Sequence, residues 1–64
     1  MKYPNVYVKL TGEDGNAFSI LTRVSKALKQ AGISKEEINK FQKEATSKDY
    51  NHLLSVVMQW VNIE

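Results

Sequence analysis

An acidic residue and the chain's one histidine, Asp49 and His52, are the first pair whose residue types could do chemistry. They stand three positions apart, so on a helix they share one turn and are close enough to act as a general-base pair. A catalytic site needs further members, and no serine or cysteine nucleophile with a defined setting completes this one. A helix cap with a solvent-facing His52 explains the same residues. We therefore expect no catalytic residue and no enzyme.

The loop Gly12-Glu13-Asp14-Gly15-Asn16 is the second candidate. It has the GxxG outline with which KH domains clamp a nucleic-acid backbone, and it leads into a helix start that can hold a phosphate. Two carboxylates at its centre would repel that phosphate, and this loop follows a strand whereas the KH loop joins two helices. The acids are adjacent rather than alternate, unlike those of a calcium-binding EF-hand loop. A tight turn whose acids suit the positive helix end is the favoured interpretation, with phosphate binding as the alternative.

Three basic residues, Arg23, Lys26 and Lys29, form the third candidate because they lie opposite the apolar arc of one helix. The chain holds nine basic and seven acidic residues, a net charge of +2, and no acid occurs between residues 16 and 35. No turn of the helix-turn-helix kind precedes this helix, which speaks against a groove-reading helix. The two alternatives are a weak nucleic-acid-binding face and an ordinary solvated face.

Composition excludes several classes of site. The chain has no cysteine, which rules out disulfides, thiolate nucleophiles, zinc fingers and iron–sulfur ligation, and one histidine makes a histidine-built metal site improbable. We expect neither a metal nor a cofactor. With 42% hydrophobic and 25% charged residues the composition is that of an ordinary globular domain. No stretch resembles a secretory signal or a membrane span, so we expect no membrane partner and a cytoplasmic location.

The elements that would position these residues follow from the hydrophobic pattern. Residues 6–10 alternate between apolar and polar and predict the one clear strand. Residues 17–31 place their apolar members within an arc of roughly 120°, which predicts an amphipathic helix. Gly32 suits the left-handed residue that ends this helix. Ser34 and Glu37 predict a capping box, in which the Glu37 side chain returns to the Ser34 amide.

Two more helices are expected, one at about 35–45 and one that begins near Tyr50. The tail at 60–63 either continues the last helix or turns out of it to pair with the first strand. The predicted fold class is therefore α+β and mostly helical, with one N-terminal strand, three helices and, in the second case, a short C-terminal strand. Residues 1–64 form a single small domain.

The last helix carries more apolar surface than a chain of 64 residues easily covers. Its apolar residues span roughly 200°, whereas one packed face needs about 100°. Val56 and Trp60 lie on the flank that is left over, and the first strand needs a partner, either the tail or a second copy. These points favour a homodimer or another protein contact through Val56, Trp60 and Tyr7. Alternatively, Val56 and Trp60 roof the strand within one chain.

Read whole, the chain resembles a family of short bacterial proteins of unknown function that also occur in phage and plasmid contexts. The likeness is carried by residues 12–18 (GEDGNAF), 31–38 (AGISKEEI) and 49–54 (DYNHLL), and by the pair Trp60-Val61. The resemblance implies a bacterial cytoplasmic setting and no particular activity, ligand or catalytic residue. If residues 12–18 mark a functional loop in that family, this chain retains it.

Taken together, the residues favour a non-enzymatic protein-interaction module that forms a homodimer. The alternative is a weak nucleic-acid-binding protein that uses Arg23, Lys26 and Lys29.

Overall fold

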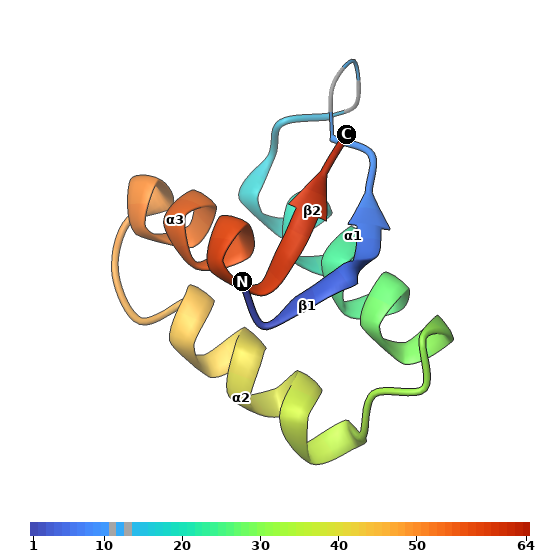
Figure 1. Cartoon of the computed structure of the whole chain (residues 1–64). Helices are drawn as coiled ribbons and strands as arrows, with labels where there is room; N and C mark the ends of the chain where they lie inside the picture. Colours follow the sequence, from blue (N-terminus) through green and yellow to red (C-terminus); the bar gives the residue numbers. More distant parts are fainter. Residues whose placement is uncertain (11, 13) are drawn as a thin grey trace.

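The computed structural model describes residues 1–10, 12 and 14–64, and it has the predicted order of elements (Figure 1). The fold is α+β and mostly helical, as expected. Five elements follow one another along the described chain: β1 (Tyr3–Val8), α1 (Ala17–Gln30), α2 (Lys35–Ala45), α3 (Tyr50–Trp60) and β2 (Val61–Ile63). The tail leaves the helical path at Val61, so the second of its two alternatives is confirmed.

The two strands run parallel and side by side (Figure 1). Tyr3 is the partner of Val61, and the register shifts between Tyr3 and Tyr7, where β1 bulges. Beyond the sheet, the backbone N–H of Glu64 donates to the carbonyl of Val8 at 2.9 Å. The strand begins earlier than residue 6 because pairing with the tail, rather than alternation, sets its start. Its partner is therefore the chain's own tail.

Each helix begins with a side chain that caps it. The side chain of Asn16 accepts from the N–H of Phe18 at 2.8 Å, and that of Asp49 accepts from the N–H of His52 at 2.9 Å. Ser34 caps α2 in the same way. A cap satisfies backbone donors that have no partner inside the helix, which is why these residue types mark helix starts.

The predicted end of α1 is confirmed, whereas half of the predicted capping box is wrong. Gly32 has a φ of 84°, and the N–H of Ile33 donates to the carbonyl of Leu28 at 3.0 Å, as in a Schellman end. The carboxylate of Glu37 does not return to the Ser34 amide. It accepts from the hydroxyl of Tyr3 at 2.7 Å instead, because β1 brings a stronger donor to it.

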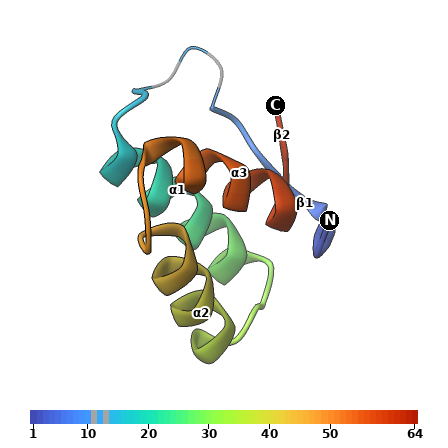
Figure 2. The ribbon, with the colours of Figure 1, turned by 90° about the vertical axis from the view of Figure 1, so that its left-hand side faces the viewer.

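All three helices lie on one side of the sheet, and the core sits between the two layers (Figure 2). Alternation along β1 turns Val6 and Val8 into this core and leaves Tyr7 exposed. The largest fully buried side chains come from all three helices and from β2: Phe41, Leu28, Val24, Val56, Val57 and Val61.

The expectation that Val56 and Trp60 are left over for a partner is wrong. Val56 is 1% exposed and Trp60 is 5% exposed within the single chain. The ring of Trp60 lies 5.4 Å from that of Phe41 and 5.8 Å from that of Tyr3, measured between ring centroids. Helix α2 and the start of β1 close over the flank of α3, so these two residues are core. The homodimer stays a prediction, without these residues to support it.

Candidate functional site

The exposed side of α1 carries Arg23, Lys26 and Lys29, as the sequence predicts. Its opposite side is apolar, with Ile20, Val24 and Leu28 buried in the core. A helix that buries one stripe turns the residues between those positions outward. The predicted basic face is thus present on the surface of α1.

An open groove of about 750 Å³ runs between α1 and α2. Ile33 and Ile38, both partly buried, give it apolar lining, while the side chains of Ser25 and Gln42 join the two helices by a hydrogen bond of 2.9 Å. Three of its residues are lysines: Lys26, Lys29 and Lys35. The groove combines apolar lining with positive charge.

Two smaller depressions adjoin this groove and extend the positive charge. One, of about 280 Å³, lies between β1 and α1 and includes Tyr7, Lys9, Arg23 and Lys26. The other, of about 290 Å³, lies at the start of α1 and includes Phe18 and Arg23. Lys26 lines both the groove and the first depression, and Arg23 lines both depressions, so the three hollows form one surface.

We call this region the basic surface and define it by five cationic residues: Lys9, Arg23, Lys26, Lys29 and Lys35. Among the residues that the structure describes, no aspartate or glutamate lines any of the three hollows. Within the described part of the chain, the four lysines make no ion pair. Sequence reasoning found Arg23, Lys26 and Lys29 but missed Lys9 and Lys35, because only the fold brings β1 and the start of α2 beside α1.

The described carboxylates lie mostly elsewhere. Glu36, Glu37 and Glu44 belong to α2, and Asp49 caps α3. Two acids border the basic surface. Asp14 accepts a hydrogen bond from Ser19, which lines the depression at Phe18, and the backbone of Glu64 pairs beside the end of β1. Most of the described carboxylates therefore belong to α2 or cap α3 and do not line the three hollows of the basic surface.

The candidate loop is held by its own side chains. The carboxylate of Asp14 accepts from the N–H of Asn16 at 3.0 Å and from the hydroxyl of Ser19 at 3.1 Å. The carbonyl of Gly15 accepts from the hydroxyl of Tyr50 at 2.6 Å. Of the predicted loop residues, Gly12 has a φ of 78° and Glu13 lies outside the described residues. These contacts are those of a structural turn. The carboxylate of Asp14 accepts from the N–H of Asn16, a donor that a bound phosphate would need. A binding role for the loop stays a prediction.

The structure brings Ser47 to His52, a contact that the sequence did not reveal. Ser47 Oγ lies 3.2 Å from His52 Nε2, which resembles a nucleophile and base. However, the Ser47 hydroxyl donates to the carbonyl of Glu44 at 2.7 Å, and His52 Nε2 is 3.1 Å from the same carbonyl. Since a carbonyl only accepts, both groups donate to it and neither activates the other. The ring is also half-buried rather than solvent-facing, which corrects that expectation.

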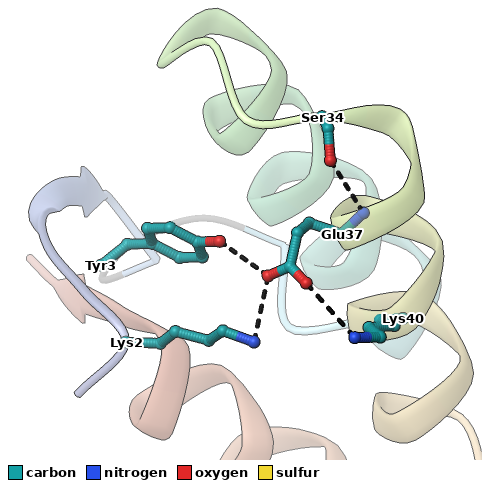
Figure 3. A network of polar contacts seen from close by, with 5 residues as sticks. All are labelled: Lys2, Tyr3, Ser34, Glu37 and Lys40. Carbon is teal, nitrogen blue, oxygen red and sulfur yellow. Dashed lines mark hydrogen bonds and ion pairs between the residues drawn. The ribbon is translucent and has the colours of Figure 1, made fainter.

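A second polar network joins the N-terminus to α2 and is drawn in Figure 3. The carboxylate of Glu37 accepts from Tyr3 at 2.7 Å and lies 3.0 Å from Lys2 Nζ and 3.6 Å from Lys40 Nζ. We call these four residues the Glu37 clamp. The hydrogen bond from Tyr3 lowers the pKa of Glu37, and the contact with Lys2 lowers it further. The same hydrogen bond raises the pKa of Tyr3. A carboxylate held ionised in this way is a poor proton donor, so the clamp is structural.

Acid is expected to weaken the Glu37 clamp. Because the pKa of Glu37 is lower in the folded chain than its ordinary 4.5, the clamp stabilises the fold above that value and loses this contribution as the pH falls through the folded value. The pKa of Tyr3 is higher in the folded chain than its ordinary 10.0. Its hydrogen bond to Glu37 therefore stabilises the fold fully below pH 10.0, and this stabilisation is lost as the pH rises through the folded value. Glu37→Gln should therefore lower the melting temperature at neutral pH, and the difference from wild type should shrink in acid.

The matched control is Glu36→Gln, because Glu36 shares the first turn of α2 but is not part of the clamp. It should leave the acid limb of the pH profile as in the wild type. Melting curves by circular dichroism measure both variants, and parallel pH profiles for wild type and Glu37→Gln would contradict the assignment.

The described residues offer neither a metal site nor a membrane-spanning helix. No group of three or more His, Cys, Asp or Glu side chains within them could hold a metal ion. None of the described helices has the length and apolar composition needed to cross a membrane. Comparison with protein-family models, curated proteins and solved structures found no match to the chain. The resemblance to the bacterial family therefore stays a prediction. The geometry of the basic surface is the remaining basis for a function.

Proposed function

We infer that the protein binds nucleic acid through the basic surface. The observation that carries this proposal is the grouping of five cationic residues around three adjoining hollows, with no carboxylate among the described residues that line them. Lysines that face no internal anion are available to phosphates, and phosphate contacts supply most of the affinity of non-specific nucleic-acid binding. This was the second of the two functions expected from the sequence.

The spread of the charges favours a chain of phosphates over a single small anion. Arg23, Lys26 and Lys29 are spaced along α1, and a rise of about 1.5 Å per residue puts roughly 9 Å between the first and the last. Lys9 and Lys35 extend the surface to either side, near β1 and at the start of α2. A site for one phosphate would instead gather its donors around one point. A polyanion fits the observed arrangement better.

The protein-interaction module that the sequence favoured has less support. Its two apolar anchors, Val56 and Trp60, are buried in the single chain, and its third residue, Tyr7, lines a basic depression. The prediction of a homodimer can be tested separately by sedimentation. No arrangement of residues described above supports an enzymatic function, because the Ser47 and His52 contact and the Glu37 clamp are both occupied by internal hydrogen bonds.

Salt should control the binding. We expect a labelled oligonucleotide to bind at about 50 mM salt and to lose roughly 100-fold in affinity by about 200 mM, because four or five phosphate contacts release their counterions. The slope of log K against log salt should then be about −3 to −4. Fluorescence anisotropy over a salt series measures it. Lack of binding at low salt, or a slope near zero, would overturn the proposed function.

A further inference from the structure

We propose that the basic surface binds nucleic acid as a single strand, with Phe18 and Tyr7 as stacking platforms for unpaired bases. This inference rests on the proposed function and adds the class of ligand to it. It is carried by two exposed aromatic rings at the borders of the basic surface and by the apolar lining of the groove between its lysines.

Phe18 and Tyr7 are unusually open to solvent. Phe18 is 78% exposed and Tyr7 is 61% exposed. Within the described part of the chain, neither ring contacts another aromatic ring or a cation. Burying such large side chains is favourable, so two exposed rings beside the same cations indicate a ligand that covers them. Bases have flat apolar faces and stack on rings of this kind.

The positions of the rings relative to the charges fit one strand. Phe18 lines the depression at the start of α1, and Tyr7 lines the one between β1 and α1. Arg23 lines both depressions, so the two rings share one cationic neighbour. A single strand alternates negatively charged phosphates with bases that can turn away from one another. The basic surface offers the corresponding alternation of cations and aromatic faces.

The groove between α1 and α2 is suited to an unstacked base. Its volume of about 750 Å³ is within the range of small-ligand sites, and Ile33 and Ile38 line it with apolar groups. Asn39 adds an amide that can donate to or accept from a base edge. Lys29 and Lys35 line the same groove and can reach the adjoining phosphates.

A duplex would use these features poorly. Its base faces are stacked on one another and closed to side chains, so only its edges and backbone could be contacted. Only the lysine contacts would remain for a duplex, and the exposed rings would stay uncovered.

The test compares four probes at low salt by fluorescence anisotropy: oligo-dT and oligo-U of about 20 nucleotides, a duplex of the same length, and inorganic polyphosphate as competitor. We expect at least one of the two single strands to bind about 10-fold more tightly than the duplex. Replacing Phe18 and Tyr7 together by alanine should weaken single-strand binding by about 10- to 100-fold and leave competition by polyphosphate unchanged. Tyr7→Phe, which keeps the ring, should bind like the wild type.

The control is Met58→Ala, because Met58 is 63% exposed on α3 and does not line any of the three hollows. Circular dichroism confirms that each variant is folded. Equal binding of duplex and single strand, or full binding by the double alanine variant, overturns this inference while the proposed function survives. Absence of binding to every probe overturns both.

Discussion

Replacing Trp60 by alanine is expected to lower the free energy of unfolding by about 3–5 kcal/mol, because it empties a central part of the core. Trp60 is 5% exposed, packs against the rings of Tyr3 and Phe41, and has Lys2 Nζ 4.2 Å from its ring centroid. A domain of this size has a total stability of roughly 3–10 kcal/mol, at about 0.05–0.15 kcal/mol per residue. The loss is therefore a large fraction of the total stability of the fold.

Urea denaturation followed by circular dichroism measures this effect. Met58→Ala is the control, since Met58 is an exposed apolar residue of the same helix, and it should change stability by less than about 0.5 kcal/mol. Trp60→Phe keeps a ring at the site and should lose less than Trp60→Ala. If Trp60→Ala melts within a few degrees of the wild type, Trp60 is not the core residue described above.

Reversing two charges on the basic surface is expected to lower the affinity for nucleic acid by about 100-fold at low salt. The variant carries Lys26→Glu and Lys29→Glu. Both lysines line the groove between α1 and α2, and neither has an internal ion pair among the described residues. The two glutamates would repel phosphates that the lysines attract, so the loss exceeds that of removing the contacts alone.

A matched control carries the same reversal at Lys43 and Lys48, which line none of the three hollows. Both variants go from a net charge of +2 to −2, since each Lys→Glu change removes two units. Lys43 lies in the last turn of α2 as Lys29 lies in the last turn of α1, so the effect on the helix dipole is also matched. The control should lose no more than about 3-fold. Equal losses would mean that overall charge, rather than the basic surface, determines binding.

The sequence predicted correctly those features whose hydrogen bonds lie within one short segment of the chain. Ser34 was recognised as the cap of α2 and Gly32 as the end of α1, because each makes its hydrogen bonds to residues within a few positions. The apolar stripe of α1 was found for the same reason. Such features depend on backbone geometry and side-chain length alone.

The basic surface was only partly predictable. Arg23, Lys26 and Lys29 share one helix, so their common face follows from helical spacing. Lys9 and Lys35 join them through the packing of β1 and α2, and the exposed Phe18 was passed over because its position on α1 does not distinguish it from a partly covered residue. No periodicity in the chain encodes which elements become neighbours.

The errors share one physical cause. A partner was one of the two alternatives for Val56 and Trp60 because the apolar arc of α3 is wide, and Glu37 was assigned to its own helix because the capping box is a local motif. In the folded chain β1 and α2 cover Trp60, and Tyr3 and Lys2 take the Glu37 carboxylate.

The amino-acid order was thus sufficient for the starts of the helices, the end of α1 and the basic side of α1, since these depend on contacts between near neighbours in the chain. The parallel pairing of β1 with the tail, the enclosure of Trp60 and the assembly of five cations around the three hollows arose only on folding. Each of these joins residues distant in sequence, and the free energy that selects such contacts comes from burying many side chains at once.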